Sequence, residues 1–530
     1  MVKFLLTLCL FTITLSLKSI IPAPNEVTTG NGKITISRCS IQLNSNSQPL
    51  LGIHESFFNP NFACLTHDAS PFTIQSKVID SSDSCTKESY ELIITETKAE
   101  ISSPCYAGSV RGYSTLFNLF DFNEDYSLIT IDSLPIHIKD SPRFDYRGVM
   151  IDTSRHFLKK STIKRVIDGM VLVKLNVLHW HISDDDSFPM YSPSYPDLAK
   201  DASFSPSMIY EKEDIDEIVN YARQRSIKIV PELDTPSHTR AVGLHEPLRD
   251  IFTCFNKHKL VDIEGFAATI IGPPPAVMDP TMDKTYEFIK NIFKDLDEYF
   301  KGDMIHLGGD EVLTDCWDER PSIKEYMKKH NIPDYKALLS HYFDRELKII
   351  QEVSPSKKFI QWVCESDTNI QYGKDVILQY WGKSANLANF SRRFPDNKFI
   401  LSPNDFAYLD CGYEGLKGGN AWCGEFSTWA HMYYFEPTSF GIHKDKILGG
   451  EVCAWGELID DDDIETKLWP RASAYAAAFW EPPRPPKADL VRLAESLINF
   501  SRYLQALGIG TSPITGEYCE RNTKECFTEY

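Results

Sequence analysis

Two adjacent acids, Asp310 and Glu311, follow a pair of glycines in the stretch HLGGDEV. Neighbouring residues of an extended strand point to opposite faces of a sheet, so two acids in that setting could not share one pocket. A turn at Gly308 and Gly309 could bring both carboxyls to the same site, because glycine tolerates the backbone angles of tight turns. Two carboxyls in one pocket push their pKa values apart and can divide acid and base work between them. The stretch therefore predicts a catalytic carboxylate pair at a strand end.

A simpler interpretation of the same acids is structural. Asp310 could cap the next helix, and Glu311 could favour the first turn of that helix. The choice between the two interpretations depends on what stands at the ends of the other predicted strands.

Short strand-like runs alternate with longer helical patterns through most of the chain, which is typical of an α/β protein with a parallel sheet. Eight such runs can be counted, although the seventh and eighth units are less regular. They are residues 147–154, 176–184, 227–234, 303–311, 358–365, 375–382, 398–405 and 446–455. Eight units predict a closed (β/α)8 TIM barrel, which we place in residues 141–530.

Two further segments precede the predicted barrel. In residues 1–20, Lys3 precedes an apolar run of roughly a dozen residues, which is typical of a secretory signal peptide. The alternative is a membrane anchor, but the run is short for a bilayer span, which needs about 20 residues. Residues 22–140 show short β-like runs and one helix-like stretch, and they predict a smaller N-terminal α+β domain.

The composition limits the partners of the protein. The 530 residues include 55 basic and 74 acidic side chains, a formal charge of -19 that argues against nucleic acid. No later segment is apolar for long enough to cross a membrane, so we expect no membrane span in the mature chain. Loss of the signal peptide removes Cys9 and leaves an even number of cysteines, which suggests disulfides in the secretory pathway. Cys411 with Cys423 and Cys519 with Cys526 could each close a loop.

Acids and tryptophans recur where the predicted strands end. These residues are Asp152, Arg155, Asp184 to Asp186, Glu232, Asp234, Asp310, Glu311, Trp362, Glu365, Trp381, Asp405, Trp455 and Glu457. Barrel enzymes build their sites at this face, so we expect one cup lined by carboxylates and aromatic rings. Such a cup suits a sugar, because carboxylates accept its hydroxyls and tryptophan packs on its C–H face.

Two rival functions come from other classes. His179 and His181 alternate on one predicted strand and, with His238, His306 and the nearby aspartates, could ligate the metal of a hydrolase. A histidine on an apolar strand is more often a hydrogen-bonded interior residue, and three tryptophans are unusual company for a metal. The second rival is a sugar-binding protein that has lost catalysis, against which the intact acid pair argues.

Five motifs in order resemble one enzyme family. DYRGVMIDTSRHF, LHWHISDDDSFP, PELDTPSHT, HLGGDEV and GGEVCAWGE with LWPRAS are similar to motifs of the β-N-acetylhexosaminidases of glycoside hydrolase family 20. The resemblance implies a catalytic TIM barrel that removes terminal β-linked N-acetylglucosamine or N-acetylgalactosamine with retention of configuration. It also implies that the substrate's own acetamido oxygen attacks C1, giving an oxazolinium-type intermediate, and that no metal or organic cofactor takes part.

The resemblance assigns roles by position. Glu311 would protonate the leaving oxygen and later activate water, and Asp310 would orient and stabilise the acetamido group. The remaining implied sugar contacts are Arg155, Tyr408, Asp410, Trp362, Trp381, Trp455 and Glu457. Asp184 and His238 would form a pair behind the general acid. The wording around Tyr408, SPNDFAYLD, departs from the aromatic-rich pattern that the family leads us to expect.

The resemblance also bears on covalent links and on assembly. Cys254 and Cys316 match the positions of a family disulfide. The cysteine that often pairs with the family's counterpart of Cys519 is missing from this sequence, and Cys526 would take its place. A homodimer and a lysosomal or secreted location would fit the family.

Overall fold

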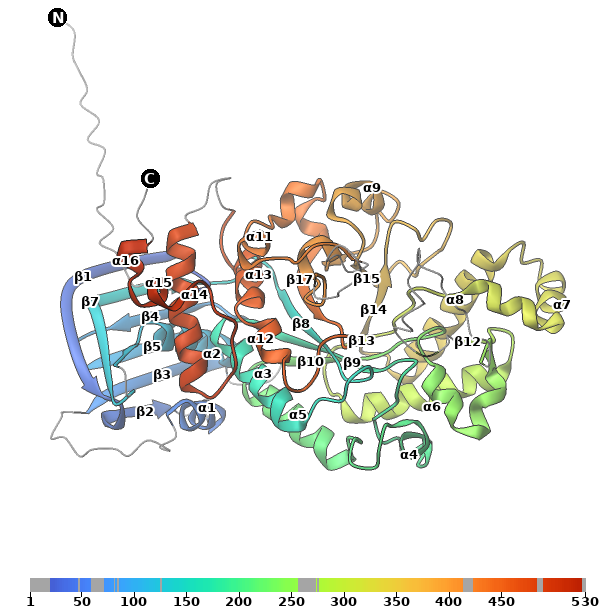
Figure 1. The fold of residues 1–530 in the computed structure, drawn as a ribbon, viewed down its shortest axis with the longest axis horizontal. Helices are drawn as coiled ribbons and strands as arrows, with labels where there is room; N and C mark the ends of the chain where they lie inside the picture. The colour runs from blue at the N-terminus through green and yellow to red at the C-terminus, as the bar shows by residue number, and fades with distance from the viewer. Residues whose placement is uncertain are drawn as a thin grey trace, which may run out of the picture.

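Eight parallel strands close into a barrel in the larger part of the molecule (Figure 1). They are β8 (Tyr146–Asp152), β9 (Val177–Ser183), β10 (Lys228–Leu233), β13 (Met304–His306), β14 (Lys358–Val363), β15 (Ile377–Tyr380), β16 (Phe399–Leu401) and β17 (Ile447–Ala454). Each of the eight predicted runs overlaps one of these strands, with β8 beginning one residue before its run, so the TIM-barrel prediction is confirmed. The fourth strand ends at His306, five residues before the predicted run does, because the chain turns at the following glycines.

Helices between the strands cover the outside of the barrel. The longer ones are α3 (Lys160–Leu172), α5 (Lys212–Gln224), α6 (Asp283–Tyr299), α8 (Tyr335–Val353) and α13 (Arg471–Trp480). Short helices stand in the irregular later units: α9 (Leu387–Ser391), α10 (Asn404–Ala407), α11 (Trp429–Tyr433) and α12 (Ile464–Leu468). Smaller insertions are α4 (Leu198–Ala202), α7 (Pro321–Lys329) and the pair β11 (Phe252–Thr253) and β12 (Val277–Met278).

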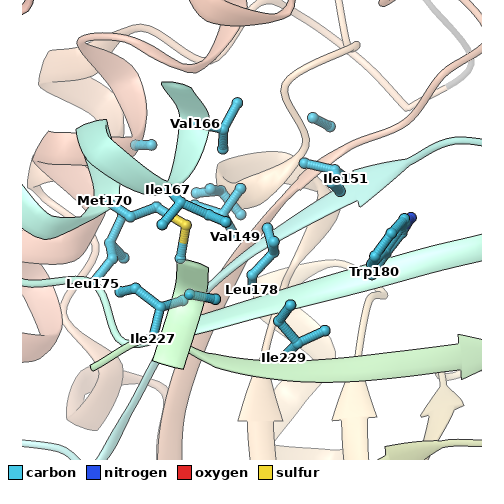
Figure 2. Close-up of a cluster of buried hydrophobic side chains, with 14 of the residues drawn as sticks. Val149, Ile151, Val166, Ile167, Met170, Leu175, Leu178, Trp180, Ile227 and Ile229 are labelled. Atoms are coloured by element: carbon cyan, nitrogen blue, oxygen red, sulfur yellow. The ribbon is translucent and has the colours of Figure 1, made fainter. Parts of the chain in front are cut away.

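The core between helices and barrel explains why the strand sequences are so apolar. Every residue of β8 and of β9 is buried, as expected for parallel strands covered on both faces. Figure 2 shows Val166 and Met170 of α3 in the same cluster as Val149 of β8 and Leu178 of β9. These contacts hold the first βα units in place.

The interior of the barrel is layered. One apolar layer holds Tyr146, Val177, Val230, Met304, Ile360, Ile377 and Ile400, which form a single buried cluster. Side chains two residues further along a strand face the same way and make the next layer toward the carboxyl ends. That layer is polar except for one ring, and it holds His179, Glu232, His306, Trp362, Gln379, Ser402 and Glu451.

A second sheet lies beside the barrel (Figure 1). Its strands run in the order β1-β7-β4-β5-β3-β2, with β6 paired to β7. They are β1 (Glu26–Ser37), β2 (Ile41–Ser45), β3 (Phe72–Asp80), β4 (Tyr90–Ile94), β5 (Lys98–Cys105), β6 (Asp121–Phe122) and β7 (Leu128–Asp140), with helices α1 (Gln48–Phe58) and α2 (Tyr106–Asn118). This mixed sheet with two helices agrees with the expected α+β domain; its limits at 22–140 stay a prediction.

The last helices of the chain return to this sheet. Figure 1 shows α14 (Leu490–Ala506), α15 (Glu517–Arg521) and α16 (Thr523–Cys526) beside the N-terminal strands. The hydroxyl of Tyr503 in α14 donates to the carbonyl oxygen of Asn118 at 2.9 Å, and its ring packs on Phe117 and Phe122. The helices that follow the barrel in the sequence therefore pack against the smaller N-terminal domain.

A buried carboxylate joins the two domains. Glu88, in the loop before β4, accepts hydrogen bonds from Arg147 of β8 at 2.7 Å and from Arg111 of α2 at 2.7 Å. Asn176, just before β9, donates to the same carboxylate at 3.1 Å. Burial alone would raise the pKa of Glu88, but the two guanidinium groups hold it below its usual value. The ionised Glu88 thus neutralises two buried cations at the amino ends of the barrel strands.

The structure is a computed structural model, and it describes residues 20–45, 48–58, 71–80, 82, 85–123, 126–255, 273, 276–412, 423–483 and 490–526. The signal-peptide prediction for residues 1–20 lies outside them apart from its last residue. Within these ranges, no helix combines the length and the apolar character that a bilayer span requires.

We expect Glu88→Ala to lower the free energy of unfolding by about 3–5 kcal/mol, since it leaves two guanidinium groups buried without their counter-charge. Urea unfolding at neutral pH measures the loss. The matched control is Glu91→Ala, because Glu91 is about two-fifths exposed in its pair with His137 and should cost at most about 1 kcal/mol. Equal effects of the two substitutions would contradict this account of the interface. Because the pKa of Glu88 is depressed, its contribution should fade as the pH falls through that pKa.

Candidate active site

The chain turns sharply after β13, and the two acids lie on this turn. Gly308, Gly309 and Glu311 all have positive φ, at 66°, 103° and 48°. A Cβ atom at Gly308 would lie 1.9 Å from Oδ1 of Asp234, so only glycine fits there. The backbone N–H of Gly309 donates to the same Asp234 oxygen at 2.7 Å. The turn leaves the Asp310 side chain only 14% exposed and the Glu311 side chain 56% exposed.

The helix-cap interpretation of Asp310 is wrong. The next helical turn begins at Thr314, and its N-cap is Leu313. Asp310 therefore lies too early in the chain to cap it.

His238 links the two acids to a third carboxylate. Its Nε2 atom lies 3.8 Å from Oδ2 of Asp310 and 3.6 Å from Oε2 of Glu311. Its Nδ1 atom lies 3.1 Å from Oδ1 of Asp184. The structure thus brings Asp184, His238 and the acid pair, drawn from three different βα units, into one row of neighbouring charged groups, which we call the charge line.

The charges of this line explain its pKa shifts. Burial would lower the pKa of His238, but Asp184 and the acid pair raise it well above its usual value. The His238 hydrogen bond in turn lowers the pKa of Glu311 against the opposing effect of burial. Burial raises the pKa of Asp310, and burial together with the Asp310 charge raises that of Asp234 well above the ordinary range. Burial and the mutual repulsion of Asp234 and Asp310 thus favour the neutral form of these carboxyls, most strongly for Asp234, while the acids around His238 favour its charged form.

Aromatic rings wall the space next to Asp310. Trp362 and Trp455 have ring centres 5.8 Å apart, and Tyr408 lies 6.1 Å from Trp455. Trp381 packs against the same cluster at its more exposed edge. Trp362 and Tyr408 are almost fully buried, so these rings form the closed side of the cup.

Charged groups line the other side of the cup. Arg155 contacts Asp184 at 2.7 Å, Asp152 at 3.0 Å and Glu457 at 3.9 Å, and its guanidinium lies 5.1 Å from the Trp455 ring centre. Burial, with the Glu457 charge, raises the pKa of Asp410 to about 8.

Several polar atoms of the cup have no hydrogen-bond partner within the described part of the chain. They are Oδ1 of Asp310, Oδ1 of Asp410, Nε1 of Trp455 and Oε2 of Glu457. Because buried polar atoms are ordinarily paired, hydroxyl and amide groups of a ligand would satisfy them.

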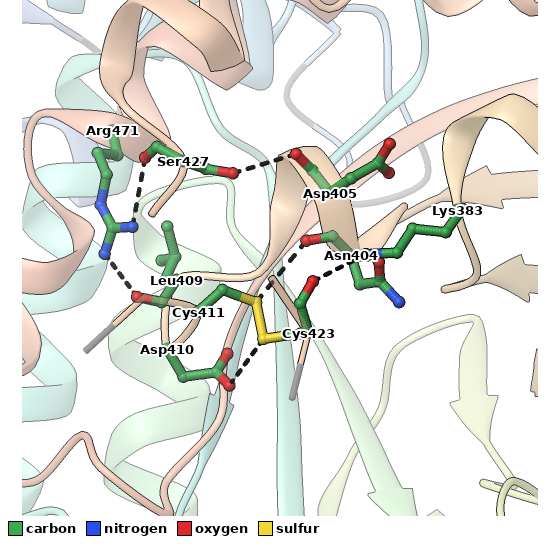
Figure 3. Close-up of a disulfide and its surroundings, with 9 residues drawn as sticks. All are labelled: Lys383, Asn404, Asp405, Leu409, Asp410, Cys411, Cys423, Ser427 and Arg471. Atoms are coloured by element: carbon green, nitrogen blue, oxygen red, sulfur yellow. Dashed lines mark hydrogen bonds between the residues drawn. A yellow bond between two sulfur atoms is a disulfide. The ribbon is translucent and has the colours of Figure 1, made fainter. Parts of the chain in front are cut away.

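A disulfide shapes the loop that carries Tyr408 and Asp410 (Figure 3). Cys411 and Cys423 are bonded, with Cα atoms 5.6 Å apart, and Arg471 donates to the carbonyl oxygen of Leu409 at 2.7 Å. The loop is held from both sides. The described residues also include the disulfides Cys85–Cys105, Cys254–Cys316 and Cys519–Cys526. The Cys254–Cys316 link implied by the resemblance is therefore confirmed, and so are the two predicted short loops, Cys411–Cys423 and Cys519–Cys526.

Two of the predicted strand-end acids do not join the cup. Glu365 accepts from Tyr380 at 2.9 Å and from Asn386 at 2.9 Å, and Asp405 accepts from the hydroxyl and backbone of Ser384. Both acids bind their own neighbouring loops. Strand-end position alone could not separate them from the acids that face the pocket.

The predicted metal role of His181 does not fit its surroundings, whereas His179, Glu232 and His306 lie close enough together to hold an ion. His179 and His181 are fully buried, and the ring nitrogens of His181 contact Glu232 at 2.6 Å and Asp184 at 2.9 Å. Both nitrogens of His181 are therefore engaged by carboxylates, as in a salt-linked imidazolium.

Three contributors to the site were given no role in the sequence-based assignment. Asp152 fixes Arg155, Asp234 receives the Gly309 N–H, and Glu232 binds Trp362 and His181. All three stand at predicted strand ends, and this position was the feature of the sequence that pointed to the site. Their partners come from other strands, which no local pattern reveals.

Comparisons with known proteins agree with this geometry. The model of glycosyl hydrolase family 20, catalytic domain, matches residues 144–483. The chain is 33% identical over 455 residues to the beta-hexosaminidase subunit beta of Homo sapiens, covering 84% of this chain and 76% of that protein. It is 30% identical over 464 residues to a beta-hexosaminidase of Emericella nidulans, covering 81% and 76%. The solved β-N-acetylhexosaminidase of Streptomyces coelicolor A3(2) aligns with a TM-score of 0.72 at 25% identity, covering 94% of this chain and 98% of that one.

The chain therefore belongs to glycosyl hydrolase family 20. It is a glycoside hydrolase of the β-N-acetylhexosaminidase type.

We expect Gly308→Ala to lower kcat/KM by about 100-fold or more, because the added methyl would displace the turn that places both acids. Hydrolysis of an aryl β-N-acetylglucosaminide measures the loss. Gly52→Ala is the control, since a Cβ at Gly52 in α1 meets no atom within 4 Å. A near-normal rate for Gly308→Ala would contradict the steric argument.

Proposed function

We propose that this enzyme removes terminal, non-reducing β-linked N-acetylglucosamine or N-acetylgalactosamine by a retaining, substrate-assisted mechanism. The observation that carries the proposal is the division of the acid pair. The Asp310 side chain is 14% exposed and interacts electrostatically with Tyr408 of the aromatic cluster, whereas the Glu311 side chain is 56% exposed. The inner carboxylate suits the acetamido group, and the outer carboxyl suits the bond to be broken.

In the first step, the acetamido oxygen of the sugar attacks C1 as the bond from C1 to the leaving oxygen breaks. Glu311 donates its proton to that oxygen. Asp310 accepts the amide N–H and stabilises the positive charge that develops on the amide. In the second step, Glu311 takes a proton from water and the water oxygen attacks C1 of the oxazolinium. The bond from C1 to the acetamido oxygen breaks as the new bond forms, which regenerates the acetamido group. The two inversions at C1 together retain the configuration.

The charge line behind Glu311 supports this role. In the free enzyme His238 carries the proton and lowers the pKa of Glu311. A sugar lying over Glu311 would exclude water, and desolvation favours the protonated carboxyl. Asp184, paired with His238 and Arg155, balances the cations on either side.

The remaining polar groups would bind the sugar ring from its far side. We assign Arg155 to O3 and O4, Asp410 to the hydroxyls near O4 and O6, and Glu457 to hydroxyls of the same ring. Tyr408 would donate to the acetamido carbonyl, and Trp362, Trp381 and Trp455 would enclose the methyl group and the ring face. Side chains that bind O3, O4 and O6 of the sugar leave no room for a further sugar attached at its non-reducing side. This supports the removal of terminal residues only, that is, exo action.

We also propose that the protein acts in the secretory pathway, as a lysosomal or secreted enzyme. The disulfides Cys85–Cys105 and Cys254–Cys316 support this location, because such bonds persist in oxidising compartments. A homodimer stays a prediction, which size-exclusion chromatography with light scattering would test.

Glu311→Gln should reduce kcat/KM by about 100- to 10,000-fold for sugars whose leaving group needs a proton. The reduction should shrink steadily as the leaving-group phenol becomes more acidic, since such a group departs as the anion. A series of aryl β-N-acetylglucosaminides measures this dependence. A loss that is the same across the series would show that Glu311 is not the acid.

Asp310→Asn should reduce kcat/KM by about 100- to 1,000-fold, because it removes the charge that opposes the acetamido cation. It should also weaken a thiazoline mimic of the cyclised amide far more than it weakens the product sugar. Inhibition constants for both ligands give this comparison. Near-normal turnover by Asp310→Asn, or rapid hydrolysis of plain glucosides by the parent enzyme, would refute substrate assistance.

A further inference from the structure

The polar layer inside the barrel is unusual, because barrel interiors are ordinarily filled by branched apolar side chains. Glu232 lies at its centre and is fully buried. A buried carboxylate is costly unless several donors compensate it. Glu232 therefore needs an explanation in terms of the groups that it binds.

Glu232 divides its two oxygens between the sugar pocket and the charge line. Its Oε1 atom accepts from the indole Nε1–H of Trp362 at 2.6 Å, and Nδ1 of His306 lies 3.1 Å from the same oxygen. Its Oε2 atom accepts from Nδ1 of His181 at 2.6 Å, and Nε2 of His179 lies 3.0 Å from the same oxygen. One carboxylate thus touches both a wall of the cup and a histidine outside it.

His181 extends the connection toward the general acid. Its Nε2 atom donates to Oδ2 of Asp184 at 2.9 Å. Asp184 meets His238 through its other oxygen, and His238 lies 3.6 Å from Glu311. Negative and positive groups therefore alternate from the middle of the barrel to its rim.

We propose that Glu232 is a positioning residue for the hydrolysis, acting through Trp362 on the acetamido pocket and through His181 on the protonation of Glu311. This inference rests on the proposed function, in which Glu311 is the acid and Trp362 encloses the amide. Glu232 itself touches neither the substrate nor the reacting atoms.

The groups that surround His181 come from several elements. They are Asp152 and Arg155 after β8, Asp184 after β9, Glu232 on β10 and the ring of Trp455 after β17. Burial would lower the pKa of His181, but the Glu232 charge and the Asp184 hydrogen bond raise it to about 10. The charged groups around Glu311 are Arg155, Asp184, His238 and Asp310, and Asp185, Lys336 of α8 and Asp367 line the same cavity.

Glu232→Gln separates the two connections. The amide oxygen can still accept from Trp362, while the amide NH2 faces His181 and no longer favours its charged form. The pKa of His181 then falls, and Asp184 loses part of the positive charge that balances it. With less positive charge on His181, the negative charge of Asp184 is compensated less. That negative charge favours the protonated form of nearby acids, so the pKa of Glu311 should rise.

The test is the pH profile of kcat/KM for an aryl β-N-acetylglucosaminide. Because Glu311 must be protonated to act, the activity falls as the pH rises through the pKa of Glu311. In Glu232→Gln this basic limb should move to higher pH. The inhibition constant of the thiazoline mimic should change less than about threefold, since the Trp362 bond is kept. A basic limb at the parent position would overturn the inference.

Glu346→Gln is the matched control. Glu346 on α8 is also fully buried, but it contacts Thr235 and Tyr342 rather than the charge line. Burial raises the pKa of Glu346 to about 8, so at acidic pH the amide replaces a neutral acid of similar shape. Its basic limb should match the parent enzyme, and an equal movement in this control would overturn a specific role for Glu232.

His181→Asn is the second variant, for the case in which Glu232→Gln does not fold. It breaks the connection to Asp184 and leaves Glu232 bonded to Trp362, so the same upward movement of the basic limb is expected. An unmoved limb in a folded His181→Asn enzyme would overturn the inference.

Glu311→Gln separates failure of this inference from failure of the proposed function. If Glu311 is the acid, its basic limb disappears in that variant. A limb that disappears there but stays fixed in Glu232→Gln rejects only the role of Glu232. A limb that persists in Glu311→Gln rejects the assignment of the acid itself.

Discussion

The hydrogen bond from the Gly309 backbone to Asp234 is the contact on which the geometry of the site depends. It holds the chain in the turn that places neighbouring acids at different depths of one pocket. The same aspartate fills the space that a side chain at Gly308 would need. Burial and the Asp310 charge raise the pKa of Asp234 well above its usual value, which favours a neutral carboxyl beside Asp310. Turn geometry and charge state therefore support each other.

Alternating charge is the second constraint. Carboxylates and cations succeed one another from Glu451 and His179 through Glu232 and His181 to the rim, and each buried charge has an opposite neighbour. Such pairing is what makes ionised groups tolerable inside a protein. It also means that a change at one position alters the proton affinity of the next, so the interior of the barrel belongs to the chemistry as well as to the fold.

The smaller domain contributes at the opposite end of the barrel. Glu88 neutralises Arg147 at the start of β8, and Asp140 pairs with the buried Lys174 at 2.8 Å. Both contacts lie at the amino ends of the strands, away from the acids. The domain interface thus fixes the first strands while leaving the carboxyl ends open to the substrate, a separation of stability and function that is common in barrel enzymes.

Sequence alone determined the barrel, because eight apolar runs separated by helical patterns have few other solutions, and it determined the turn at Gly308 and Gly309, because few residues other than glycine suit it. It also placed acids and tryptophans at strand ends. Only the tertiary structure decided which of them share the pocket: Glu365 and Asp405 turn to their own loops, whereas Glu232 and Asp234 join the site. The physical reason is that strand periodicity states which side a residue faces, while its partner and its charge state are set by atoms from strands far away in the chain.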